Sequence, residues 1–224
     1  MIKVFDETAL DILPLPNGFI VSCRRADDEN SGKMVVGYNL VSFEKGTMNA
    51  VTRNVYLLAK FGQYYERIEA ALENPFYWNV AQLPNDKQLC VYPDGSARMF
   101  DTEARLLWNG EFKYGECGAA DVVFLNRDIW CSFPEEKCVA RFDPTNMRQT
   151  LRIGDMSSKF GKPCGLFAEG GTIYVCDSEL GKVWTVDTES YTVSEYAEFL
   201  EPVYQFLKID GVVLVRLESG VYKI

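Results

Sequence analysis

Four polar residues that could bind a ligand or a metal ion occupy the same place in a repeated pattern. Each one is followed by two apolar residues and then by a turn: they are Asp11, Asn79, Asp121 and Gln205. Along a β-strand, successive side chains alternate between faces, so each polar side chain points away from the apolar residue that follows it. If these strands line a channel, the four side chains form a ring near one mouth of that channel.

Carboxylate and amide oxygens are the donors that calcium and magnesium prefer. Asp11, Asn79 and Asp121 are therefore candidate metal ligands, with calcium or magnesium as the cofactor, and all four residues are candidate ligand-binding residues. The alternative is that the ring binds ordered water and that the protein has no cofactor.

Aromatic residues supply a second set of candidate binding residues. They are Tyr64, Tyr65, Trp78 and Tyr114. Aromatic side chains in loops on a rigid scaffold are well suited to binding surfaces. A periodic aromatic can instead pack between repeats, which is the alternative for Phe61, Tyr114 and Phe160 in the Lys-aromatic-Gly motifs of three loops.

Asp177 is a further candidate, at the end of an expected strand. It either points to the channel mouth or accepts hydrogen bonds from loop amides. Cysteines end the second strand of four repeats, where recurrence predicts small buried residues: Cys23, Cys90, Cys131 and Cys176. Cys117 and Cys164 are better candidates for reactive thiols, although the chain has no histidine to activate them.

Composition excludes several classes of function. Without histidine there is no His-based triad and no His metal site. The net charge of −9 repels phosphate, which disfavours nucleic acid and anionic membranes as partners. No signal peptide or long apolar segment is evident, and no cysteine pair is spaced C-x-x-C, so we expect a cytoplasmic protein with free thiols.

The elements that must position these residues come from an internal repeat. Five hairpins are predicted from turns of residues that tolerate positive φ: Asn17-Gly18, Asn85-Asp86, Asn126-Arg127, Gly170-Gly171 and Asp210-Gly211. The Asn126 turn fits least well because Arg127 does not suit it. From the second residue of each turn to the next, the steps are 68, 41, 44 and 40 residues, close to the blade period of β-propellers.

A third strand follows each hairpin, and a fourth β-rich stretch follows in four copies: Val55–Ala59, Arg105–Trp108, Gln149–Ile153 and Thr192–Tyr196. Four strands per repeat is the blade of a propeller. The fifth repeat stops at its third strand, so Ile2–Phe5 is expected to supply the missing strand and close the ring. We therefore predict an all-β fold in which residues 1–224 form one domain, a five-bladed β-propeller with four-stranded antiparallel blades.

The long first step contains two insertions, Arg24–Asn30 and Gly62–Pro75, the second with helical composition. By strand parity both are expected on the face that carries the second turns and the loops between blades. This face is the expected binding face.

The fourth repeat, Phe160–Asp187, resembles the NHL repeat and, more distantly, propellers of the senescence-marker-protein/gluconolactonase family. The matching residues include Phe160-Gly161, Pro163, Gly165-Leu166, Asp177 and Gly181. The resemblance implies a propeller but no particular function. Both families usually have six blades, and the metal ligands of the lactonase-like members cannot be placed in this sequence.

Three hypotheses for the function follow. The first is a binding module that takes a protein or a small ligand on its loop-decorated face and channel mouth. The second is a divalent-metal-dependent lactonase or esterase, in which the ion polarises a carbonyl and an aspartate acts as base. The third is a scaffold without a ligand site. The oligomeric state is not predicted.

Overall fold

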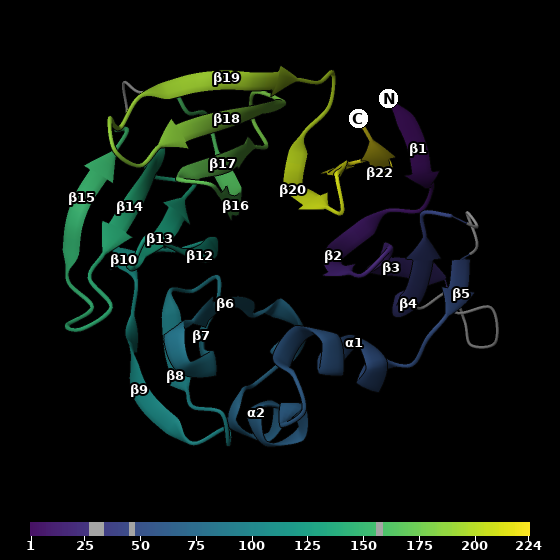
Figure 1. Cartoon of the computed structure of the whole chain (residues 1–224), viewed down its shortest axis with the longest axis horizontal. Coiled ribbons are helices and arrows are strands. Elements are labelled where there is room, and N and C mark those ends of the chain that lie inside the picture. Colours follow the sequence, from purple (N-terminus) through teal and green to yellow (C-terminus); the bar gives the residue numbers. More distant parts are fainter. Residues whose placement is uncertain (27–33, 45–47, 156–158) are drawn as a thin grey trace.

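The expected five-bladed β-propeller is confirmed. The computed structural model describes residues 1–26, 34–44, 48–155 and 159–224. Within them, five four-stranded antiparallel sheets surround a central axis, and the first strand of each sheet faces that axis (Figure 1).

Each blade is named by its strands in the order in which they pair, starting from the axis. The first blade contains β2 (Ala9–Leu15), β3 (Gly18–Ala26), β4 (Met34–Ser42) and β5 (Met48–Ala50). The second contains β6 (Asn79–Leu83), β7 (Lys87–Val91), β8 (Ser96–Phe100) and β9 (Leu106–Glu111). The third contains β12 (Asp121–Leu125), β13 (Asp128–Phe133), β14 (Cys138–Phe142) and β15 (Gln149–Ile153). The fourth contains β16 (Pro163–Glu169), β17 (Thr172–Asp177), β18 (Lys182–Asp187) and β19 (Val193–Glu198). The fifth contains β20 (Val203–Ile209), β21 (Val212–Leu217), β22 (Gly220–Lys223) and β1 (Ile2–Phe5). A small hairpin of β10 (Lys113–Tyr114) and β11 (Cys117–Gly118) joins the second blade to the third.

The ring closes through the N-terminal strand, as expected. β1 pairs antiparallel with β22, with Ile2 opposite Lys223 and Lys3 opposite Tyr222, and the two chain ends lie side by side (Figure 1). Phe5 is 2% exposed and packs with Ile12, Val21 and Leu214 between the fifth and first blades. Closure therefore covers the edge of β22 and also joins the two ends of the ring by hydrophobic contact.

The tight hairpin turns form in all five repeats. Asn17, Asn85, Asn126 and Asp210 each have a φ between 50° and 61°, which polar residues with short side chains tolerate. Arg127 also adopts a positive φ, 71°, and Leu125 still pairs with Asp128 across the turn. The least favourable turn sequence is thus overridden by the pairing of the two strands that it connects.

One predicted strand is wrong. Residues 55–59, predicted to be the fourth strand of the first blade, lie in the helix α1 (Arg53–Phe61). The fourth strand is β5, which begins at Met48. The buried residues of α1 are Tyr56, Leu57, Lys60 and Phe61, a spacing of one helical face. Gly62, with a φ of 76°, ends the helix.

The segment between the first and second blades is helical from residue 53 to residue 77 with short breaks. α1 is followed by α2 (Tyr65–Ala71) and by a 3₁₀ turn, η1 (Pro75–Tyr77). A second 3₁₀ turn, η2 (Pro84–Asp86), covers the hairpin turn of the second blade. Most of the other expected insertion, residues 27–30, and the expected turn Ser31-Gly32 lie outside the described residues.

The two helices fill the space between the first and second blades (Figure 1). Their apolar residues, among them Tyr56, Leu57 and Ile68, form one buried cluster with Ile20 of the first blade and Phe100 of the second. At the other junctions, the buried clusters consist of residues from the neighbouring blades themselves. The helix pair therefore acts as a wedge that completes the ring.

The four cysteines at the ends of second strands are free and fully buried, as the packing interpretation predicts. Burial raises the pKa of the Cys90 thiol to about 12 and that of Cys23 to about 11, so these thiols stay protonated and unreactive. No helix in the described ranges is long and apolar enough to cross a bilayer.

The closing strand provides a stability test. We expect Phe5→Ala to lower the free energy of unfolding by about 3–5 kcal/mol, because it leaves a cavity where the ring closes. Urea unfolding measures the change. Ile2→Ala is the matched control in the same strand: Ile2 is 65% exposed, and its replacement should change the value by less than about 0.5 kcal/mol. Equal effects of the two variants would contradict closure by β1.

Candidate functional site

The polar residues predicted to form a ring line one cavity at the mouth of the central channel. This cavity of about 210 Å³ is bounded by Asp11, Asn79, Asp121 and Gln205, and by Gly165 at the fifth equivalent position. All five stand at or near the start of an innermost strand. A second cavity of about 430 Å³ continues along the same strands. It shares the four polar residues of the ring and is also lined by apolar residues such as Leu13, Val80 and Val123.

β-Bulges turn the side chains of two members of the ring, Asp11 and Gln205, toward the cavity. The pairing of β2 with β3 shifts between Ala9 and Asp11, and that of β20 with β21 shifts between Val203 and Gln205. A bulge bends its strand and redirects the next side chain. The skipped residues, Leu10 and Tyr204, also line the cavity.

The fifth position of the ring has no side chain because the neighbouring strand is too close. A Cβ atom on Gly165 would lie 2.1 Å from the backbone oxygen of Tyr204. Only glycine fits there, so this side of the cavity is walled by backbone.

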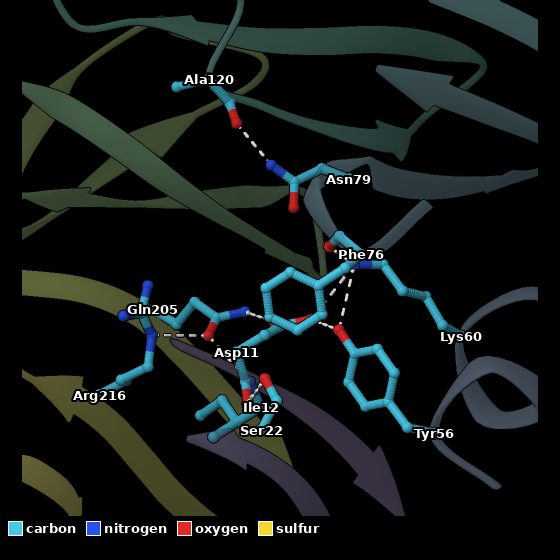
Figure 2. A network of polar contacts seen from close by, with 10 residues as sticks. All are labelled: Asp11, Ile12, Ser22, Tyr56, Lys60, Phe76, Asn79, Ala120, Gln205 and Arg216. Carbon is cyan, nitrogen blue, oxygen red and sulfur yellow. Dashed lines mark hydrogen bonds and ion pairs between the residues drawn. The ribbon is translucent and has the colours of Figure 1, made fainter. Parts of the chain in front are cut away.

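Asp11 is bound by the helix that was predicted to be a strand. Its Oδ2 accepts a hydrogen bond of 2.6 Å from the Tyr56 hydroxyl and lies 3.4 Å from Lys60 Nζ (Figure 2). The Lys60 side chain is 4% exposed and that of Asp11 is 13% exposed. Burial and the Asp11 carboxylate raise the pKa of Tyr56 well above its usual value, so the hydroxyl remains a donor.

Lys60 has no free donor. Besides Asp11, its ammonium donates to the Tyr56 hydroxyl at 3.2 Å and to the backbone oxygen of Phe76 at 2.9 Å. It thus joins α1, β2 and the segment that leads into β6. Its three N–H groups all have acceptors.

Gln205 connects Asp11 to an arginine from the next strand. Its Nε2 donates to Asp11 Oδ1 at 2.6 Å, and its Oε1 accepts from Arg216 Nε at 2.8 Å and from the Ile12 amide at 3.0 Å. Arg216 also donates to the backbone oxygen of Ala9, and its guanidinium lies 4.9 Å from the centre of the Tyr204 ring.

Asn79 and Asp121 form the opposite side of the ring. Asn79 Nδ2 donates to the backbone oxygen of Ala120 at 2.5 Å. Asp121 accepts hydrogen bonds from the amides of Val122 and Leu166. Burial raises the pKa of Asp121 to about 7 despite these two hydrogen bonds.

The contacts of Asp11 compete with the predicted calcium or magnesium site. No group of three or more acidic, cysteine or histidine side chains in the described residues is arranged to hold a metal ion. Asp11, the central predicted ligand, already accepts from Tyr56, Lys60 and Gln205. The Lys60 ammonium also places a positive charge where the cation would bind.

The aromatic candidates do not gather around this mouth. Tyr64 lines a different cavity of about 320 Å³, together with residues of the β6–β7 turn and the β8–β9 turn, at the opposite end of the ring. Tyr65 packs against the cluster around the helices. The expected position of residues 62–75 on the mouth face is therefore wrong for Tyr64, because the helix pair runs along the ring instead of lying over it.

Trp78 and Tyr114 serve packing. Trp78 is 3% exposed, and its indole donates to the backbone oxygen of Glu73, so it is not available to a partner. Tyr114 packs against Phe133 of the third blade with ring centres 4.7 Å apart. Phe61 and Phe160 are 1% and 2% exposed, which confirms the packing interpretation of the repeated aromatic.

Asp177 has the structural role named as its alternative. It is fully buried, and its carboxylate accepts from the amides of Gly161, Lys162, Glu179 and Leu180. The Trp184 indole also lies at hydrogen-bond distance. This carboxylate holds two loops of the fourth blade together and does not reach the mouth cavity.

Of the two candidate thiols, Cys164 lines the cavity. Its Sγ lies 3.3 Å from the backbone oxygen of Val203, and burial raises its pKa to about 11. It is therefore a poor nucleophile at neutral pH.

Sequence reasoning missed Tyr56, Lys60, Tyr204 and Arg216. A weak signal existed for the first two, whose spacing of four residues places them on one face of a helix. Arg216 ends the strand pattern of its repeat where the four other repeats carry a cysteine, so a charge at that place was the available signal for it.

Solved structures of similar shape include a virginiamycin B lyase from Staphylococcus aureus, which is 9% identical over 97% of this chain and 80% of its own, with a TM-score of 0.59. A catalytically inactive histidine-to-alanine variant of that lyase, solved with quinupristin, is 9% identical over 95% and 78%, with a TM-score of 0.58. The computationally designed Ika8 protein is 10% identical over 96% and 71%, with a TM-score of 0.52. No family model matches this sequence, and no curated protein matches it.

These similarities show the fold and no more. The chain is a five-bladed β-propeller with a charged cavity at one mouth of its channel. The cavity is lined by two cationic side chains, Lys60 and Arg216, and two acidic ones, Asp11 and Asp121.

We expect Lys60→Met to lower the free energy of unfolding by about 3–5 kcal/mol, because Asp11 would keep its buried charge without the cation. Urea unfolding measures the change. Lys223→Met replaces an exposed lysine and should have an effect below about 0.5 kcal/mol. A Lys60 variant as stable as the control would show that the ion pair does not hold α1 in the ring.

Asp121 should give the protein a distinctive pH dependence. Its pKa of about 7 exceeds the value of about 4 in an unfolded chain, so the folded protein binds one more proton between these values. The contribution of Asp121 to the free energy of unfolding should therefore fall as pH rises from 4 to 7. In Asp121→Asn, the slope of the unfolding free energy against pH, measured by urea unfolding, should lose the part that corresponds to the binding of one proton.

Asp143→Asn is the control of opposite sign. Hydrogen bonds from Thr145 lower the pKa of Asp143, so this residue contributes stability that is lost as pH falls below about 4. Its variant should leave the slope between pH 4.5 and 7 intact. An unchanged slope in Asp121→Asn would contradict the assignment.

Proposed function

We propose that this propeller is a binding protein that takes a small polar ligand into the cavity at the channel mouth. The observation that carries the proposal is the set of charged side chains in that cavity, which come from α1, β2, β12 and β21. Burying charges costs several kcal/mol unless they are paired. A scaffold without a ligand explains the ion pair of Lys60 with Asp11 but not Arg216, which forms no ion pair with the described residues.

The cavity is preformed. Asp11, Lys60, Gln205 and Arg216 are connected by hydrogen bonds or ion pairs at distances between 2.6 and 3.4 Å. Fixed polar groups reduce the entropy that a ligand must lose on binding. The mouth cavity of about 210 Å³ and the one of about 430 Å³ that continues from it have the dimensions of small-molecule sites, which are up to about 1,000 Å³, and this favours a small molecule over a macromolecule.

A catalytic role receives less support. The similar lyase structure includes a variant described as inactive after replacement of a histidine, and this chain has no histidine. The metal-dependent lactonase hypothesis relies on Asp11, whose carboxylate already accepts from Tyr56 and Lys60. The resemblance of the fourth repeat to the NHL repeat adds only the fold to the proposal.

A thermal-shift screen tests the proposal. Small polyols, amides, amino acids and hydroxy acids are added at millimolar concentration. A ligand at 100 times its dissociation constant adds about 2.7 kcal/mol to stability, which raises Tm by about 5–10 °C in a chain of this size. We expect at least one of these classes of compound to raise Tm by this amount.

Ala120→Leu should abolish that rise, because Ala120 lines the cavity and the larger side chain fills it. Ala70→Leu makes the same change at an exposed position of α2 and should preserve the rise. If no class raises Tm, or if Ala120→Leu responds like the wild type, the mouth cavity is not the site.

A further inference from the structure

We propose that the ligand carries a carboxylate and that Arg216 binds it. The inference rests on the proposed function and names the class of molecule that the mouth cavity takes. It depends on three residues. Arg216 keeps N–H groups, and Asn79 keeps an acceptor oxygen, that bond to no other described residue. The Tyr204 ring packs against the Arg216 guanidinium.

Arg216 is the cation of this cavity that has no anionic partner. No carboxylate in the described part of the chain lies within ion-pair distance of its guanidinium, whereas Lys60 lies 3.4 Å from Asp11. Some other arginines are paired, as Arg152 is with Glu136 and Arg25 with Glu7. Arg67 and Arg127, which have no ion pair among the described residues, are exposed, whereas Arg216 is not. An anion from outside would complete the pairing.

The guanidinium presents the edge that a carboxylate needs. Nε donates to Gln205, and Nη1 donates to the backbone oxygen of Ala9. An arginine has five N–H donors, so three are left, including both on Nη2. The remaining N–H of Nη1 and the two of Nη2 can donate to the oxygens of a carboxylate.

Two neighbours hold that edge in place. The Tyr204 ring stacks on the guanidinium with 4.9 Å between its centre and the central carbon. Gln205 fixes Nε and is itself fixed by Asp11 and by the Ile12 amide. Desolvation lowers the pKa of Arg216, yet arginine remains charged in proteins at neutral pH, so an anion would still meet a full positive charge.

The far side of the cavity offers an acceptor. Asn79 Nδ2 is engaged by Ala120, and no donor in the described residues reaches Asn79 Oδ1. In Figure 2 this oxygen points away from Ala120 into the space ringed by the labelled residues. A hydroxyl or amino group on the ligand can donate to it. The structure therefore favours a small hydroxy or amino carboxylate over a simple fatty acid.

The test uses matched pairs of acid and amide, measured by isothermal titration at neutral pH and constant ionic strength: lactate with lactamide, glycolate with glycolamide, and alanine with alaninamide. Propanoate tests the need for a ligand donor, and sulfate tests for a general anion effect. We expect at least one acid to bind at least tenfold more tightly than its amide and than sulfate.

Arg216→Gln should weaken the binding of that acid at least tenfold. Arg216→Lys should bind the acid more tightly than Arg216→Gln but less tightly than the wild type, because it keeps the positive charge without the planar guanidinium. Arg24→Gln replaces an exposed arginine and should bind like the wild type. Circular dichroism of each variant checks folding; if Arg216→Gln does not fold, the comparison of Arg216→Lys with the wild type decides, with weaker binding expected.

Three results would overturn the inference: no acid binds, an amide binds as tightly as its acid, or the Arg216 variants bind like the wild type. The proposed function survives if neutral ligands still bind in a way that Ala120→Leu abolishes. Both fail together if neither acids nor neutral compounds bind.

Discussion

The buried ion pair between Lys60 and Asp11 is the interaction on which the arrangement of the mouth depends. It joins the helix wedge to the innermost strand of the first blade, with the two polar atoms 3.4 Å apart and both side chains largely removed from solvent. Its desolvation is offset only because Tyr56, Phe76 and Gln205 satisfy the remaining donors and acceptors. The position of α1 and the charge pattern of the cavity are therefore set together.

The same constraint explains how a five-bladed ring contains a cavity with unequal sides. On one side the helix contributes Lys60, and on another Gly165 contributes only backbone because the oxygen of Tyr204 is too close for a Cβ atom. Arg216 lies across from Asn79, and bulges next to Asp11 and Gln205 turn these side chains inward. The result is a small polar cavity whose cationic and accepting groups lie on different blades.

Much of the fold and part of the site could be predicted from the sequence. Asn17-Gly18 and its equivalents mark hairpins because few residues tolerate positive φ, and the repeat of these turns indicates the blades. Asp11, Asn79, Asp121 and Gln205 could be aligned because strand alternation is strict. What they contact could not be predicted, since Tyr56 and Lys60 come from a segment whose Val and Tyr content also suits a strand.

The wrong predictions share a physical cause: contacts between residues far apart in the sequence determine where these side chains lie. A lysine is normally exposed, and only the approach of Asp11 and Phe76 explains why Lys60 is buried. Tyr64 was expected at the mouth because strand parity placed the insertion Gly62–Pro75 on that face, whereas α1 takes the chain to the other end of the ring. β-Bulges leave no clear pattern in sequence, so the inward position of Tyr204 against Arg216 could not be foreseen.

A crystal structure of the protein soaked with the most tightly bound hydroxy or amino acid tests the central claim most directly. The account predicts α1 between the first two blades, Lys60 against Asp11, and a carboxylate on the free edge of Arg216 with its hydroxyl or amino group near Asn79. A cavity that holds water alone, or an Arg216 paired with a carboxylate of the protein, would contradict it.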